Sequence, residues 1–227
     1  MRLAPQPLRL TLLVLLGVAA CSPVAVVPVQ WLRLSADAPM LPAPDGSRAA
    51  AAAAAPAPAS AGAGEVWQLV LPVALPAHLE RDTLFVPQAG VPGGGAVQPL
   101  AGARWIEPLR DAVPRVLRED IARSLHARNG APVLWRSPLP PGLVPTRQLR
   151  VEITAFEIGS GARAVVTHAR WSIADARGER PPQVHEARFD TAPAALPADA
   201  ADWAAAHRQA IAALAERIAA TMASPSP

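Results

Sequence analysis

The stretch Leu149-Arg-Val-Glu-Ile-Thr-Ala-Phe-Glu-Ile158 alternates apolar and polar side chains. The apolar residues at 149, 151, 153 and 155 face one side and the residues between them face the other, which is the period of a β-strand with one buried face. After Gly159-Ser-Gly161, the run Arg163-Ala-Val-Val-Thr-His-Ala-Arg-Trp-Ser-Ile173 alternates in the same way. The two runs are therefore predicted to form an antiparallel hairpin.

Further strands are predicted on both sides of this hairpin. They cover residues 30–34, 66–73 and 84–86 before it and residues 184–189 after it. The strand at 66–73 carries apolar residues on both faces, so we expect it to be buried on two sides. Residues 76–82 are predicted to form a turn or short connector, and the glycines at 93–95 a loop tip.

Two helices are predicted from apolar residues spaced three and four apart. The first has Pro108 in its first turn and ends before Asn129-Gly130; Pro114 is tolerated in it if the helix begins near Ala112. The second covers residues 203–222, with Asp199 or Asp202 as its N-cap. The apolar stripes consist of Leu109, Val113, Val116, Leu117, Ile121 and Leu125 in the first helix and of Trp203, His207, Ile211, Leu214, Ile218 and Met222 in the second.

The order of these elements predicts the fold class. Strands followed by helices, instead of strict β-α-β alternation, favour an α+β fold. We expect a mainly antiparallel sheet with two principal helices packed on one face.

Composition excludes several classes of protein. The chain has 227 residues, 21 Arg and no Lys, so a Walker-type phosphate loop, a Schiff-base enzyme and a kinase-type ATP lysine are ruled out. One Cys allows no internal disulfide and no cysteine-rich metal site. The net charge is only +3, and the arginines alternate with acids. We therefore expect a mixed surface that does not bind nucleic acid.

The amino terminus has the layout of a secretory signal. Arg2 and Arg9 precede a Leu-rich apolar run, which is followed by Val18-Ala-Ala-Cys21. The run from 10 to 20 is about half the length needed to span a bilayer. Its end resembles a bacterial lipobox, which implies that residues 1–20 are removed and that Cys21 is acylated as the first residue of the mature protein. With Ser22 after the Cys, this resemblance favours the inner leaflet of a Gram-negative outer membrane. The alternative is an ordinary signal peptide with an incidental Cys.

Residues 35–64 consist almost entirely of Ala, Pro, Gly, Ser and Asp. They lack the large side chains that offset the entropy of ordering, so this segment is predicted to be disordered. It is either a spacer or an insertion without a role. Residues 21–227 are expected to form one domain that contains this segment.

Residue patterns typical of catalysis or metal binding are absent from the sequence. The five histidines (His78, His126, His168, His185 and His207) have no metal-type spacing, although His168 and His185 could meet across adjacent strands. Ser160 lacks the first glycine of a nucleophile elbow. Glu107, Asp111, Glu119 and Asp120 are interpreted as solvated ion-pair partners of nearby arginines. The six tryptophans are expected to be mostly core anchors, and any others to face lipid or a partner. We predict no catalytic residue, no cofactor and no metal.

Several pieces of the sequence, in their order, resemble the PqiC-like family of ABC-type transport auxiliary lipoproteins. The pieces are Cys21-Ser-Pro23, Trp31-Leu-Arg-Leu34, Leu75-Pro-Ala-His-Leu-Glu-Arg-Asp82, Leu84-Phe-Val86, Arg104-Trp-Ile-Glu-Pro-Leu109, Val151-Glu-Ile-Thr-Ala-Phe156 and Ala169-Arg-Trp-Ser-Ile173. The chain departs from the family in having no Tyr in the first strand or near His78. The resemblance places the Ala/Pro-rich segment between the first two strands of the domain.

The resemblance implies a non-enzymatic lipoprotein on the periplasmic side of the outer membrane of a Gram-negative bacterium. Its expected partners are membrane lipid through acylated Cys21, an MCE-domain protein and ABC transporter subunits, with a homo-oligomer possible. Its expected role is to dock the periplasmic assembly for lipid traffic between membranes. The alternative is an envelope structural or assembly lipoprotein that is not linked to transport.

Overall fold

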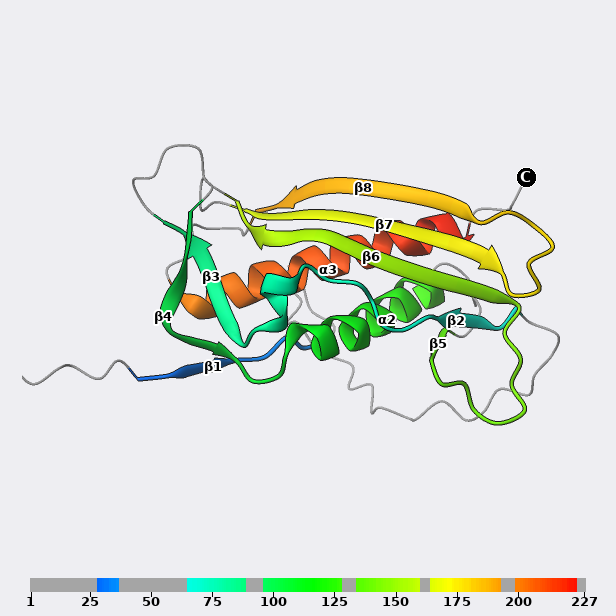
Figure 1. The fold of residues 1–227 in the computed structure, drawn as a ribbon, viewed down its shortest axis with the longest axis horizontal. Helices are drawn as coiled ribbons and strands as arrows, with labels where there is room; N and C mark the ends of the chain where they lie inside the picture. The colour runs from blue at the N-terminus through cyan, green and yellow to red at the C-terminus, as the bar shows by residue number, and fades with distance from the viewer. Residues whose placement is uncertain are drawn as a thin grey trace, which may run out of the picture.

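A computed structural model describes residues 28–36, 65–88, 96–127, 134–159, 164–192 and 199–223. The described chain forms two sheets and two long helices (Figure 1). Cys21 and the signal-like residues 1–20, most of the Ala/Pro-rich segment, the glycines at 93–95, Asn129-Gly130 and Ser160 lie outside these residues.

The larger sheet has five strands in the order β5-β2-β6-β7-β8. The long strands β6 (Arg147–Ile158), β7 (Val165–Asp175) and β8 (Gln183–Thr191) form an antiparallel meander, as the alternating sequence predicted. The short strands β2 (Trp67–Leu69) and β5 (Leu134–Arg136) extend the sheet by parallel pairing. The pairing of Ile158 with Val165 confirms the hairpin between β6 and β7.

The smaller sheet has the order β1-β4-β3. β1 (Gln30–Leu32) pairs in parallel with β4 (Val97–Trp105), and β4 pairs antiparallel with β3 (Thr83–Pro87). The predicted connector at 76–82 contains a short 3-10 helix, η1 (Ala77–Glu80). Residues 37–64 therefore lie between the first two strands of the chain, and these two strands belong to different sheets.

Helices α2 (Leu109–Ala127) and α3 (Ala200–Ala223) pack against each other on one side of the β6-β7-β8 meander (Figure 1). All members of both predicted apolar stripes are buried. Asp199 is the N-cap of α3, because its Oδ1 accepts a hydrogen bond from the backbone N–H of Asp202 at 3.0 Å. The predicted α+β class with two helices on one sheet face is confirmed, and both sheets are mixed.

Four details differ from the sequence-based expectation. β4 was not predicted because Pro99 and Gly102 interrupt its pattern; Pro99 is tolerated because β1 pairs only with residues 103–105, so β4 has one neighbour there. β5 was not predicted either, because its 3 residues are too few to show an alternation of apolar and polar side chains. The strand at 66–73 is ordered as strand only at Trp67–Leu69, with one face buried and the other half-buried. α2 begins at Leu109, so Pro114 lies inside the helix.

The buried face of β6 also changes part-way along the strand. Val151 and Ile153 point into the core as predicted, but the pairing register with β7 shifts between Ile153 and Ala155. Beyond this bulge, Phe156 and Ile158 are buried, and Ala155 is half-buried. An extra residue in one strand reverses which side chains point inward, which a strict period of two does not reveal.

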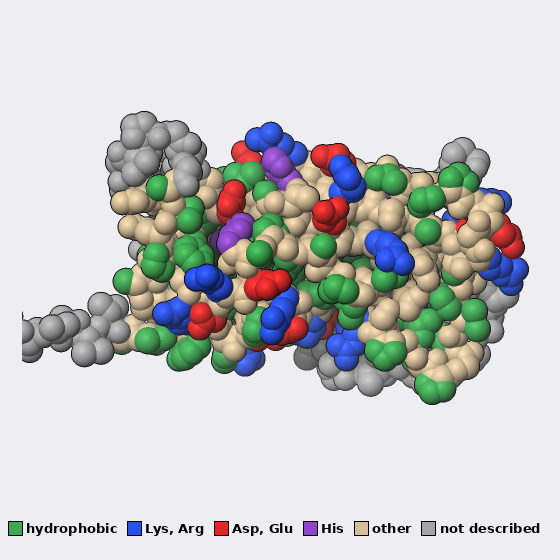
Figure 2. Space-filling model, in the orientation of Figure 1, with side chains coloured by type: hydrophobic (Ala, Val, Ile, Leu, Met, Phe, Trp, Pro, Cys, Tyr) green, Lys and Arg blue, Asp and Glu red, His purple; other side chains and the backbone are tan. Residues whose placement is uncertain are grey.

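No helix within the described residues is long and apolar enough to span a membrane. On the face shown in Figure 2, basic and acidic side chains are interspersed, as the composition predicted for a mixed surface.

Candidate functional site

The two helices are joined by a buried ion pair between Asp120 of α2 and Arg208 of α3. The Arg208 guanidinium donates to both carboxylate oxygens of Asp120, at 2.5 and 2.7 Å. The side chain of Asp120 is only 3% exposed and that of Arg208 only 8%. Arg123 adds a third hydrogen bond to Asp120 at 2.7 Å from a largely exposed position. A bidentate arginine–carboxylate pair in this setting fixes the register of the two helices.

This pair corrects the interpretation of Asp120 as a solvated ion-pair partner. The neighbouring Arg123 does lie within one turn, as that interpretation requires, but Arg208 is 88 residues away in the chain. The other three carboxylates agree better with the expectation. Glu107 pairs with Arg115, Asp111 with Arg110 and Glu119 with Arg118, all at half-buried or exposed positions.

Three arginines hold the backbone that follows β1. Arg115 donates to the carbonyl of Leu34 at 3.2 Å. Arg123 and Arg208 both donate to the carbonyl of Ala36, at 3.3 and 2.8 Å. We call this set of contacts the arginine clamp. It fixes Leu34 and the described start of the Ala/Pro-rich segment, at Ala36, onto both helices.

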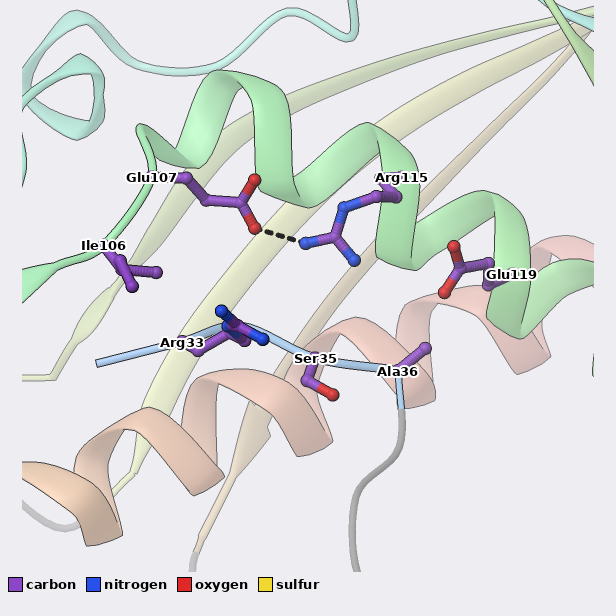
Figure 3. Close-up of a pocket in the computed structure, with 7 residues that line it drawn as sticks. All are labelled: Arg33, Ser35, Ala36, Ile106, Glu107, Arg115 and Glu119. Carbon is purple, nitrogen blue, oxygen red and sulfur yellow. Dashed lines mark hydrogen bonds and ion pairs between the residues drawn. The ribbon is translucent and has the colours of Figure 1, made fainter. Parts of the chain in front are cut away.

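A polar hollow of about 480 Å³ lies beside the clamp, between residues 33–36 and the first half of α2 (Figure 3). Arg33 and Ser35 line one side of it, and Glu107, Arg115 and Glu119 line the other. Its charges are partly paired within the protein, since Glu107 accepts from Arg115. This mixture of paired acids and bases fits a structural junction better than a catalytic site.

A second, more apolar cavity of about 570 Å³ lies between the smaller sheet and the β6–β7 end of the larger sheet. Leu79, Leu84, Phe85, Phe156 and Ile158 contribute apolar walls, and Trp105 and His207 also line it. His78 and Glu157, both about half exposed, lie at its rim with Nε2 and Oε2 3.7 Å apart. Among the described residues, this cavity has the composition of a site for an apolar molecule.

His207 is the buried polar group of this cavity. Its Nδ1 lies 2.7 Å from the carbonyl oxygen of Trp203, one helical turn earlier. Its ring meets Trp105 and Phe156 edge-on, at centroid distances of 5.7 and 5.0 Å. Burial lowers the pKa of His207 from 6.5 to about 4, although the hydrogen bond to Trp203 opposes the shift. The imidazole is therefore neutral at neutral pH.

The other histidines are not brought together. His168 is opposite Arg188 on β8, whereas His185 is opposite Trp171 and stacks on it at 5.6 Å. His168 and His185 lie on adjacent strands but are not opposite each other, so the contact that the sequence allowed between them does not form. Within the described residues, no group of three or more His, Cys, Asp or Glu side chains could hold a metal ion.

Four of the six tryptophans are core anchors, as expected. Trp67, Trp105, Trp171 and Trp203 are buried. Two of these also satisfy their indole N–H, Trp67 with Glu65 and Trp171 with Thr221. Trp31 on β1 and Trp135 on β5 are exposed, and Trp31 is 60% exposed.

Comparison with known families decides the relationship of the chain. The family model described as ABC-type transport auxiliary lipoprotein component matches residues 49–219. The chain belongs to this family. The resemblance noted in the sequence is therefore confirmed. Members of the family are auxiliary components of ABC-type transport systems, and the family is not a known enzyme family. Membership in this lipoprotein family points to a place in the cell envelope.

Among solved structures, the first two of the three named here share the fold of this auxiliary lipoprotein at low sequence identity. An uncharacterized protein is 17% identical with a TM-score of 0.54, covering 70% of this chain and 94% of its own. A DUF330 protein from Xanthomonas campestris is 17% identical with a TM-score of 0.50, covering 72% and 86%. PelC from Paraburkholderia phytofirmans, a dodecamer, is 8% identical with a TM-score of 0.40, covering 71% and 90%. The comparison with curated proteins found no match.

Proposed function

We propose that this auxiliary lipoprotein is anchored in the outer membrane by acylated Cys21, faces the periplasm, and docks an MCE-type assembly of an ABC transport system. The observation that carries the proposal is the family match over 49–219, together with the lipobox-like Val18-Ala-Ala-Cys21 ahead of it. Its contribution is docking and geometry, without bond chemistry, so that lipids pass between the two membranes through the assembly.

The position of β1 supports the anchor. Gln30, the first residue of β1, follows Cys21 by nine residues, so the two Cα atoms are at most about 32 Å apart. A tension applied through Cys21 reaches β1 first, and the arginine clamp ties the residues directly after β1 to both helices. A lipid-anchored domain that must resist being pulled away from the membrane benefits from such an attachment.

The core supports a single domain across 21–227. Leu32 and Leu34, before the Ala/Pro-rich segment, are buried in the same core as Trp67 and Leu69, after it. We therefore propose that residues 21–227 are one domain and that the segment at 35–64 is an insertion within it. Replacing residues 40–60 by a short Gly/Ser linker should change the melting temperature by less than about 3 °C, because loop length affects closure entropy only weakly.

Membrane fractionation tests the anchor. Cys21→Ser should move the protein from the membrane pellet to the soluble periplasmic fraction, since acyl chains supply roughly 0.8 kcal/mol per buried methylene. Ser22→Ala, which keeps the Cys, is the matched control and should stay in the membrane. Sucrose-gradient separation of the two membranes then tests the outer-membrane position. A Cys21→Ser protein that still pellets with membranes contradicts the anchor.

Co-purification tests the docking role. The tagged protein should capture an MCE-domain subunit from solubilised envelopes. If it captures none, while remaining acylated and folded, docking is wrong and an envelope structural or assembly role takes its place. Self-capture by a differently tagged copy tests the possible homo-oligomer in the same experiment.

A further inference from the structure

The cavity between the two sheets has walls suited to an aliphatic molecule. Leu79, Leu84, Leu109 and Phe156 are buried around it. Its volume of about 570 Å³ falls within the roughly 300–1,000 Å³ of small-molecule sites. Val97, 52% exposed, and the half-exposed His78 and Glu157 also line the cavity, so it is open to solvent. None of these residues belongs to the arginine clamp.

His207 supplies one polar atom at the buried end. A backbone carbonyl only accepts hydrogen bonds, so the contact between Nδ1 and the Trp203 oxygen requires the proton on Nδ1. In the neutral ring, Nε2 then carries a lone pair and acts as an acceptor. Nε2 has no hydrogen-bond partner among the described residues, and the side chain, only 2% exposed, lines the cavity. An acceptor that faces a cavity open to solvent is satisfied by water or by a ligand that brings a donor.

We propose that this cavity binds an aliphatic amphiphile whose buried end carries an uncharged hydroxyl, with the hydroxyl donating to His207 Nε2 and the hydrocarbon lying along the leucine and phenylalanine walls. A carboxylate or phosphate at that end is disfavoured, because a buried anion would face an acceptor nitrogen in apolar surroundings. The inference goes beyond docking, since it gives the auxiliary lipoprotein a lipid-type ligand of its own.

Calorimetric titration with two probes of equal size tests the hydroxyl. The probes are 1-nonanol and 1-methoxyoctane, which have the same number of heavy atoms, but only the alcohol donates. The protein is the full chain carrying Cys21→Ser, which avoids detergent. Nonanol should bind about tenfold more tightly than the ether, as expected for one hydrogen bond to a buried acceptor. Shortening the alcohol should weaken binding about fourfold per methylene.

Two variants locate the site. Val97→Trp fills the edge of the cavity and should weaken nonanol binding about tenfold, whereas Val184→Trp, at a 61% exposed valine of β8, should leave it unchanged. His207→Phe keeps an aromatic ring beside Trp105 and should remove the preference for the alcohol. If His207→Phe does not fold, the Val97 and Val184 pair still decides the location.

Clear outcomes overturn the proposal. Nonanol that does not bind, binds Val97→Trp as well as the parent, or binds no better than the ether refutes it. Nonanoate that binds more tightly than nonanol shows that the polar end lies outside the cavity, and it refutes the hydroxyl assignment. None of these titrations depends on acylation of Cys21 or on capture of an MCE subunit, so the two proposals fail separately.

Discussion

Removing the carboxylate of Asp120 should destabilise the protein far more than any surface change. Asp120→Ala leaves the Arg208 guanidinium buried at 8% exposure without its two hydrogen bonds of 2.5 and 2.7 Å. An uncompensated buried charge of this kind costs about 3–5 kcal/mol, which for a chain of this size lowers the melting temperature by roughly 6–20 °C. Arg123→Ala removes a partner that is 57% exposed and should cost less than about 1 kcal/mol.

A double variant separates the ion pair from the packing around it. Asp120→Leu combined with Arg208→Met removes both charges and should be more stable than either single variant by about 2 kcal/mol. The Ala36 carbonyl then keeps only Arg123, at 3.3 Å. Equilibrium urea unfolding gives the free energy of unfolding of the parent protein, of Asp120→Leu, of Arg208→Met and of the double variant. The buried pair does not hold the helices together if Asp120→Ala lowers the free energy of unfolding by less than about 1 kcal/mol. The same conclusion follows if Arg123→Ala lowers it as much as Asp120→Ala does.

Burial of His207 predicts a dependence of stability on pH. The unfolded chain binds a proton near pH 6.5 and the folded one only near 4, so stability should fall on acidification through this window, by about 3 kcal/mol in total. His207→Phe should flatten the free energy of unfolding between these pH values; an unchanged slope would contradict the pKa. Trp105→Ala should lower the free energy of unfolding, measured in urea, by about 3–5 kcal/mol, because Trp105 is buried. Trp31→Ala should lower it by less than about 1 kcal/mol, because Trp31 is exposed. Similar losses for the two variants would refute the assignment of Trp105 to the core. Asp199→Ala should lower the melting temperature by about 2–4 °C through loss of the α3 cap.

Long periodic elements could be predicted from the sequence, and short or interrupted ones could not. β6, β7, β8 and the two helices each repeat their pattern over 9 to 24 residues, so several buried positions support the same period. β5 has 3 residues, and in β4 the positive φ of 74° at Gly102 and the ring of Pro99 break the alternation. The bulge after Ile153 was also hidden, because it depends on the partner strand.

The buried ion pair left a trace in the sequence that the local pattern obscured. Asp120 lies three residues after Leu117 and four after Val116, on the apolar stripe of α2, where a carboxylate needs a partner. Arg123, three residues further on, is a sufficient local partner for this carboxylate, so the sequence alone does not call for a second one. Arg208 likewise lies on the buried side of α3, four residues after Ala204 and three before Ile211. Charged residues on two apolar stripes would have indicated the pair; only the fold could show that they meet.

His207 links the stability of the protein to the proposed ligand site. The burial that lowers its pKa to about 4 is also what keeps the ring neutral and leaves Nε2 as an acceptor at neutral pH. A ligand hydroxyl donates to the neutral ring and could only accept from the protonated one, and an apolar ligand that displaces water from the cavity disfavours the charged ring. The ligand should therefore stabilise the protein at pH 7 and progressively less as His207 becomes protonated near pH 4. A ligand that stabilises the protein equally at both pH values does not contact His207.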